Sequence, residues 1–170
     1  MRKGGLIYPL TKKGYEAHTS SYTQHHLFFD WVMVNESRFD FLSNGERLLG
    51  VWLLEAQGVH YNLTEPFVCF DIMRGNDRTT YDRFRQMVAG KFILPAVIHR
   101  GKAISIGNAL DKLGDCSYYS DQDKAKGALW RVEKLTPYKH FEFLAKYIRP
   151  SFVRGCRKGM SNIGEKHESN

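Results

Sequence analysis

The chain reads GALWRVE at residues 127–133 and FLAKYIRP at residues 143–150, two strand-like runs that each carry a cation among apolar side chains. Side chains alternate between the two faces of an extended run, so Arg131 and Lys146 each share a face with leucine or isoleucine. An ion pair, or a lysine stem lying along the core with its head in water, explains a single such cation. Two neighbouring strands that each carry such a cation instead indicate a cleft that accepts an anion.

Outside these runs, the hydrophobic pattern alternates between helix and strand spacing. Apolar residues at 27, 28, 31 and 32 have the spacing of an amphipathic helix, Ser105 is a typical N-cap, and Asn44-Gly45 is a turn signal. The predicted elements are a strand pair over 6–17 broken at Gly14, helices over 23–35, 78–88 and 105–113, strands over 47–54, 67–72, 127–133 and 143–150, an edge strand over 92–99 and a polar loop over 115–126. We therefore predict an α+β fold of largely antiparallel sheets with flanking helices.

The length and charge suggest one basic domain. A chain of 170 residues is one folded unit by the usual size of domains. We place this domain at residues 1–150 and expect a basic, mobile tail over residues 151–170. The formal net charge is +7 and the pI is about 9.3. Such a charge favours a polyanionic partner, because lysines and arginines that contact phosphates release condensed counterions.

The composition argues against several other classes of protein. No apolar run approaches the roughly 20 residues that cross a bilayer, and the N-terminus has no secretory apolar region, so we expect no membrane partner and a cytoplasmic protein. The widely spaced Cys69, Cys116 and Cys156 predict reduced structural thiols without a zinc site. His25 and His26 point about 100° apart on a helix, which favours a helix surface over a metal site.

Five blocks of the sequence have the order and spacing of a known family. They are GVWL at 50–53, HY at 60–61, FVCFDI at 67–72, GALWR at 127–131 and FLAKYIRP at 143–150. In these blocks the chain resembles the RNA ligase domain of the ATP-dependent covalent nucleotidyltransferase superfamily, from about residue 10 to residue 150. The resemblance implies part of the nucleotidyltransferase domain, an ATP-grasp-like ligase fold. RNA-capping guanylyltransferases share the superfamily but fit the last block less well.

The resemblance implies a particular chemistry. In that family a lysine in a Lys-x-Asp-Gly motif attacks the α-phosphate of ATP, and the lysyl-AMP is passed to a 5′-phosphate end that a 3′-hydroxyl then seals. Other lysines and Mg²⁺ stabilise the charge on the phosphoryl oxygens. ATP and Mg²⁺ are therefore the implied cofactors, RNA is the implied partner, and ATP-dependent end joining of nucleic acid is the implied activity.

Four residues match positions that contact the nucleotide in this family. Lys146 matches the strand lysine that contacts the α-phosphate, and its apolar face fits a desolvated cation. Phe70 matches the aromatic residue that stacks on adenine, or it is an ordinary core phenylalanine. Arg131 matches the arginine after the family's Glu-Gly block, or it makes a surface ion pair. Lys12 lies where relatives have an arginine that holds the nucleotide or RNA phosphates.

Two further cations match positions near nucleic acid. Arg149 corresponds to a basic position beyond the strand lysine, or it too makes a surface ion pair. Lys13 lies beside Lys12 at the predicted turn and is assigned to contacts with nucleic acid. No metal ligands are assigned.

The chain departs from the family pattern at positions that carry the chemistry. It contains no Lys-x-Asp-Gly, and residues 6–15 resemble the strand after this motif, so we expect the segment of the nucleophile to have ended before Met1. Where this chain has Val51, relatives have a glutamate that binds the ribose. Where it has Lys126, relatives have a glutamate used in metal and proton chemistry, and the ammonium of Lys126 would repel Mg²⁺. Catalytic residues therefore stay unassigned. Two hypotheses remain: a truncated or divergent RNA ligase, and a non-catalytic relative that binds nucleotide or RNA.

Overall fold

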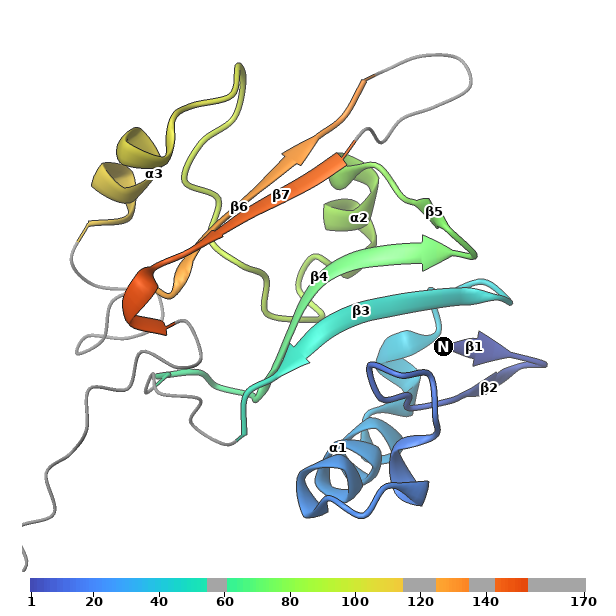
Figure 1. The fold of residues 1–170 in the computed structure, drawn as a ribbon. Helices are drawn as coiled ribbons and strands as arrows, with labels where there is room; N and C mark the ends of the chain where they lie inside the picture. The colour runs from blue at the N-terminus through green and yellow to red at the C-terminus, as the bar shows by residue number, and fades with distance from the viewer. Residues whose placement is uncertain (55–60, 115–124, 135–142, 153–170) are drawn as a thin grey trace, which may run out of the picture.

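The computed structural model describes residues 1–54, 61–114, 125–134 and 143–152, and it confirms the predicted α+β class (Figure 1). The elements are β1 (Arg2–Lys3), β2 (Leu6–Ile7), η1 (Ala17–Thr19), α1 (Thr23–Val34), η2 (Glu36–Phe39), β3 (Glu46–Trp52), β4 (Phe67–Arg74), β5 (Asp77–Arg78), α2 (Tyr81–Val88), α3 (Ile106–Leu113), β6 (Gly127–Val132), β7 (Phe143–Ile148) and η3 (Pro150–Phe152). The strands pair as β1–β2, β3–β4–β5 and β6–β7, and every pair is antiparallel.

The β3–β4 pair, which was predicted as two strands, lies at the centre of the molecule. β4 is buried along most of its length, whereas β3 is mainly half-buried. The pairing register shifts between Leu49 and Gly50. A Cβ atom on Gly50 would overlap the Phe67 ring and lie 2.8 Å from the Val68 carbonyl oxygen. Only glycine therefore lets the two strands approach each other at this point.

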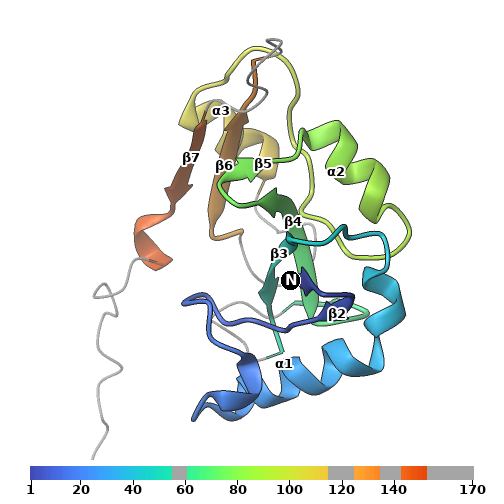
Figure 2. The same ribbon diagram turned by 90° about the vertical axis from the view of Figure 1, so that its right-hand side faces the viewer.

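The predicted helix over 23–35 is confirmed as α1, which packs on this sheet through aromatic side chains. The Phe28 and Trp52 rings are 5.4 Å apart, and the Trp31 and Phe67 rings are also 5.4 Å apart. Burial of one such side chain contributes about 1.5–3 kcal/mol to stability. α1 and the β1–β2 pair lie on one side of the β3–β4 sheet, and the β6–β7 pair lies on the other (Figures 1 and 2).

The two later helices differ in how closely they match the prediction. α2 begins three residues later than the predicted start of 78, because Asp77 and Arg78 pair with β4 as β5. α3 is confirmed, and the Ser105 hydroxyl accepts a hydrogen bond from the Asn108 N–H at 3.1 Å. This cap satisfies one of the backbone donors that a helix leaves unpaired at its N-terminus.

The predicted edge strand over 92–99 is wrong. This segment makes a single parallel bridge, between Val68 and Ile93, and the Cys69 N–H donates to the Ile93 carbonyl at 3.0 Å. Residues 94–99, which follow Ile93, are in no helix or strand. Pro95 has no N–H to donate to a ladder, and side chains of this segment instead line the cavities described below.

The predicted strand pair over 6–17 is also shorter than expected. It is reduced to one bridge between Leu10 and Glu16, and the regular hairpin lies earlier, between β1 and β2. The turn at Asn44-Gly45 is confirmed, with Gly45 at a φ of +83°. The loop at 115–124 and the tail from residue 153 onward lie outside the described residues.

Cys69 is a buried free thiol on β4, in agreement with the prediction of a structural cysteine. Burial raises the pKa of this thiol to about 12. The side chain therefore stays protonated at neutral pH and packs as a small apolar group. Cys116 and Cys156 lie outside the described residues.

The two strands that carry the predicted cations pair as expected. β6 and β7 form an antiparallel ladder from Gly127 opposite Ile148 to Val132 opposite Phe143. The Trp130 indole N–H donates to the Ile104 carbonyl at 3.0 Å, which attaches β6 to the segment before α3. This ladder forms one wall of the candidate site.

Candidate functional site

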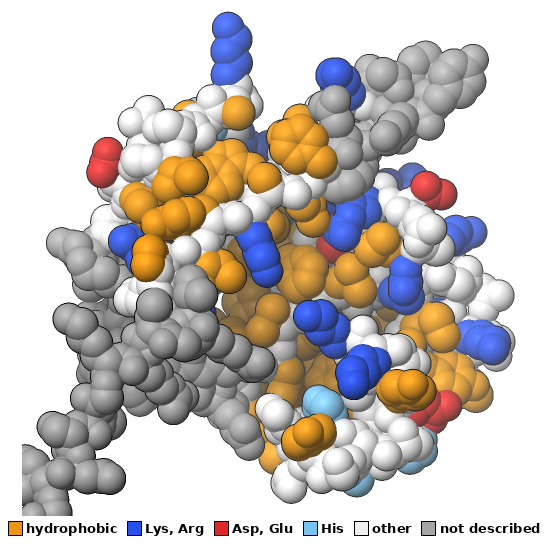
Figure 3. Space-filling model, viewed as in Figure 1, with side chains coloured by type: hydrophobic (Ala, Val, Ile, Leu, Met, Phe, Trp, Pro, Cys, Tyr) orange, Lys and Arg blue, Asp and Glu red, His pale blue; other side chains and the backbone are white. Residues whose placement is uncertain are grey.

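A cavity of about 730 Å³ lies between β4 and β6. Residues of β4, α2, the segment 95–104, α3 and β6 line it, together with Leu144 of β7. Figure 3 shows the molecular face hollowed between the β6–β7 pair and the β3–β4 sheet, with hydrophobic side chains on the floor and lysines and arginines around it. The volume lies within the range of about 300–1,000 Å³ that is typical of small-molecule sites.

Asp71 of β4 is the buried charge in the wall of this cavity, with 1% of its surface exposed. Its Oδ2 atom accepts a hydrogen bond from the Arg78 guanidinium. Its Oδ1 atom accepts from Arg131 Nη1 at 3.1 Å and from the Ile72 N–H at 2.9 Å. Burial and the repulsion from Arg131 lower the pKa of Arg78, although an arginine stays charged at neutral pH. Two cations thus compensate one carboxylate that has no access to water.

Glu133 fixes the other side of the Arg131 guanidinium. Its Oε1 atom accepts from Arg131 Nε at 2.5 Å and from the backbone N–H of Tyr81 at 2.8 Å. Arg131 also donates to the Thr79 carbonyl. Tyr81 is the first residue of α2, where a carboxylate is favoured by the helix dipole and by unpaired N–H groups. The end of β6 is thereby joined to the start of α2.

The cavity brings together two of the residues that were predicted to bind a nucleotide, Phe70 and Arg131. The Arg131 side chain is 12% exposed, so the predicted cation on an apolar strand is found here. Lys126, which replaces a family glutamate, also lines the cavity, and desolvation lowers the pKa of its ammonium. The structure therefore contains a concave site beside the cation-bearing strand, as the sequence predicts.

Lys146 differs from the expectation. It lies opposite Leu129 in the ladder, but it is exposed and is not among the residues that line the cavity. The expected desolvation of this cation is therefore wrong, because β6 and β7 form a two-stranded pair whose face is partly open to water. Its assigned contact with a nucleotide phosphate stays a prediction.

The remaining predicted cations lie away from the cavity lining. Arg149 Nε donates to the Ala125 carbonyl at 3.0 Å, and the Arg149 N–H donates to the Lys126 carbonyl at 2.8 Å, so this residue supports the backbone that carries Lys126. Lys12 and Lys13 are exposed in the turn between Leu10 and Glu16. Their contacts with nucleic acid also stay predictions.

The sequence reasoning missed Asp71, Glu133 and Tyr81. A signal for Asp71 was present, because a carboxylate inside the apolar run FVCFDI needs a cationic partner when the strand is buried. No local signal pointed to Glu133 or Tyr81, because they meet only when β6 approaches the start of α2.

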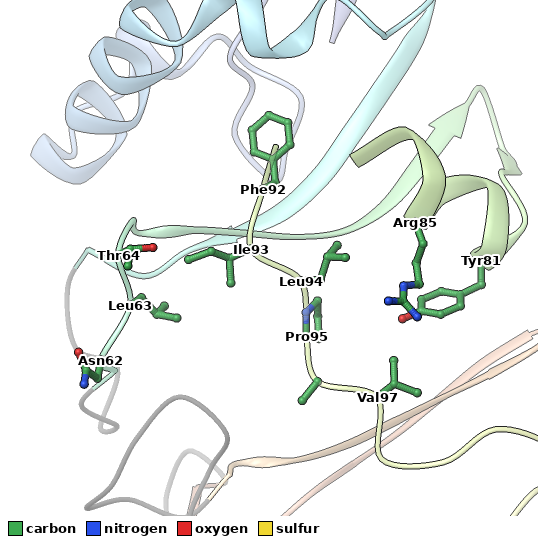
Figure 4. A pocket seen from close by; sticks show the side chains of 11 residues that line it. Asn62, Leu63, Thr64, Tyr81, Arg85, Phe92, Ile93, Leu94, Pro95 and Val97 are labelled. Carbon is green, nitrogen blue, oxygen red and sulfur yellow. The ribbon is translucent and has the colours of Figure 1, made fainter. Parts of the chain in front are cut away.

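A second cavity, of about 560 Å³, adjoins the first. The two share a wall of five residues, Leu63, Tyr81, Pro95, Ala96 and Val97. Figure 4 shows the side chains of Tyr81 and Arg85 extending from α2 beside one another, across from the Leu94–Val97 segment. Burial raises the pKa of the Tyr81 hydroxyl, against the opposing effect of Arg85 and two further arginines. Asp82, the nearest acidic residue along the helix, pairs with Arg100.

Arg38 holds the wall of this second cavity in place. It makes a bidentate ion pair with Glu65, at 2.6 and 2.9 Å, and donates to the Lys91 carbonyl. Its guanidinium lies 4.6 Å from the centre of the Phe92 ring and 5.4 Å from that of Trp31. These contacts fix both chain segments that flank the cavity, since a planar guanidinium pairs and stacks at once.

The residues of the larger cavity do not fit the Mg²⁺ that the resemblance implies. Asp71 and Glu133 are its lining carboxylates, and both accept hydrogen bonds from arginine. No group of three His, Cys, Asp or Glu side chains suited to a metal is found within the described ranges. His25 and His26 instead contact Ser20, each at 2.6 Å.

Comparisons with protein-family models, curated proteins and solved structures found no match to the chain. Among the described residues, none of the helices has the length and apolar character needed to span a bilayer.

Proposed function

We propose that this chain is an RNA ligase-like protein that binds an adenine nucleotide in the cavity between β4 and β6, and that it also binds RNA. The observation that carries the proposal is the meeting of Phe70 and Arg131 on one cavity of ligand size. The two residues come from separate blocks of the sequence, 67–72 and 127–131, and the resemblance matches each of them to a position that contacts the nucleotide. Phe70 supplies an aromatic face for adenine, and Arg131 supplies a preorganised cation for phosphate.

The apolar floor of the cavity supports the same ligand. An aromatic base removes apolar surface from water when it enters such a site, whereas phosphates remain at the charged side. Lys126 and Arg100 add two more cations to the lining. Electrostatic attraction in a partly desolvated cavity is stronger than in bulk water, so a small number of cations gives a useful contribution to affinity.

We propose binding without covalent transfer, and end joining is the second candidate. Val51, at the position of the ribose-binding glutamate, is 41% exposed and offers no acceptor to a ribose. Lys126 stands at the position of the second family glutamate. The resemblance of the five blocks supports a ligase ancestry, while these two replacements favour a protein that retains the nucleotide site and lacks the adenylation chemistry.

Phe70→Ala should weaken ATP binding about 5- to 150-fold, because loss of base stacking costs about 1–3 kcal/mol. Isothermal titration calorimetry of the whole chain, with and without Mg²⁺, measures the affinity. Phe143→Ala is the matched control, since Phe143 is 49% exposed on β7 and is outside the described lining of the cavity. Equal effects of the two substitutions, or no ATP binding by the wild type, would contradict the proposal.

A label experiment separates the two candidates. Incubation with α-labelled ATP and Mg²⁺ should leave no acid-labile, alkali-stable label on the protein if the site only binds nucleotide. A label that maps to a lysine would support end joining instead.

Arg85→Ala should weaken binding of single-stranded RNA about three- to tenfold, because the cation beside Tyr81 is available to a phosphate. Arg83→Ala is the control: Arg83 is exposed on the same helix and belongs to neither described cavity lining. Fluorescence anisotropy at several salt concentrations gives the affinity, which should fall steeply with salt. An affinity insensitive to salt, or equal losses in both variants, would argue against RNA binding at this face.

A further inference from the structure

The carboxylates of the larger cavity are already used inside the protein. Both oxygens of Asp71 accept hydrogen bonds from arginine, and the side chain is 1% exposed. One oxygen of Glu133 accepts from Arg131 and from the N-terminus of α2. Mg²⁺ requires near-octahedral oxygen ligands and is usually held by one or two carboxylates together with the phosphates of the nucleotide. The described lining leaves a single carboxylate oxygen without such a hydrogen bond.

The charge of the lining also disfavours the binding of Mg²⁺. Three cationic side chains, Arg100, Lys126 and Arg131, are in the described lining together with two carboxylates, and Arg100 also pairs with Asp82 outside it. Arg78, behind Asp71, adds a fourth cation to the network. A divalent cation that entered with a nucleotide would come close to these groups, and the repulsion would be only partly screened in a cavity. The same cations can neutralise phosphate oxygens directly.

We propose that the cavity binds its nucleotide as the metal-free anion, so that lysine and arginine take the place of Mg²⁺. This inference rests on the proposed nucleotide site and specifies the form of the ligand: free ATP, with all four of its negative charges, in preference to the magnesium complex. Arg131 is preorganised for this role, because Asp71, Glu133 and the Thr79 carbonyl fix its guanidinium before a ligand arrives.

Titration calorimetry of the whole chain with ATP tests this inference under two conditions of equal ionic strength, excess EDTA and excess MgCl₂. We expect ATP to bind at least about fivefold more tightly in EDTA. Equal affinity in the two conditions, or tighter binding with Mg²⁺, would overturn the inference and leave the nucleotide site standing. Absence of ATP binding in both conditions would instead remove the nucleotide site itself.

Lys126→Glu provides the second arm, because it places a carboxylate where relatives have one. We expect this variant to lose at least tenfold in affinity for metal-free ATP and to bind ATP more tightly when Mg²⁺ is added. Lys112→Glu is the matched control: it makes the same charge change on α3, outside the described lining, and should keep the wild-type preference for EDTA. A Lys126→Glu variant that behaves like the control would count against Lys126 as a substitute for the metal.

Discussion

Asp71→Asn should lower the free energy of unfolding by about 3–5 kcal/mol, as breaking a buried ion pair commonly does. The carboxylate is 1% exposed and compensates two guanidinium groups, those of Arg78 and Arg131. An asparagine has nearly the same shape but no charge, so Arg78 and Arg131 would both lose Asp71 as a counter-ion, and Arg131 would keep its pair with Glu133. The packing of β4 would hardly change, and the loss would therefore report the electrostatic contribution.

Urea denaturation followed by circular dichroism measures this effect. Asp77→Asn is the matched control, because Asp77 is an exposed carboxylate on the adjoining strand β5 and its loss should cost less than about 0.5 kcal/mol. Loss of only about 1 kcal/mol or less in the Asp71 variant would mean that water or other anions compensate the arginines, and the network described above would then be too weak to hold Arg131 in place.

Local patterns predicted the elements that are decided by local physics. The apolar spacing in α1, the Ser105 cap of α3 and the alternation in β6 and β7 are each encoded within a few residues. The segment 92–99 shows the limit of this approach. Its composition suits a strand, yet whether it pairs depends on β4, which offers it a single bridge at Val68.

The candidate site shows the same limit more clearly. Alternation along β6 and β7 correctly predicts which side chains share a face, but it does not say how much of that face another element covers. Arg131 is covered by β4 and the start of α2, and Lys146, on the same face, is exposed. One ion-pair partner of Arg131 is Asp71, 60 residues earlier in the chain, and that pairing follows from tertiary structure.

Gly127→Ala should lower the free energy of unfolding by about 3 kcal/mol or separate the β6–β7 pair locally. A Cβ atom at this position would overlap the Tyr147 carbonyl oxygen and lie 2.9 Å from its carbonyl carbon and 3.0 Å from the Ile148 Cα. These are backbone atoms of the partner strand, so no rotation of a side chain relieves the overlap. The φ angle of Gly127 is in the ordinary negative range, and the requirement for glycine is purely steric.

The same substitution at Gly107 should have the opposite sign, which makes it the natural control. The nearest atom to a Cβ on this α3 residue is the Ser105 hydroxyl oxygen at 3.9 Å, so alanine fits without strain and should stabilise the helix by about 0.5–1 kcal/mol. Urea denaturation of both variants, with ATP titrations of any that fold, tests the pair. Because Gly127 directly follows Lys126 and begins the strand that carries Arg131, displacement of β6 should also abolish nucleotide binding. A Gly127→Ala protein with wild-type stability and ATP affinity would mean that the close approach of β6 and β7 is not required for the site.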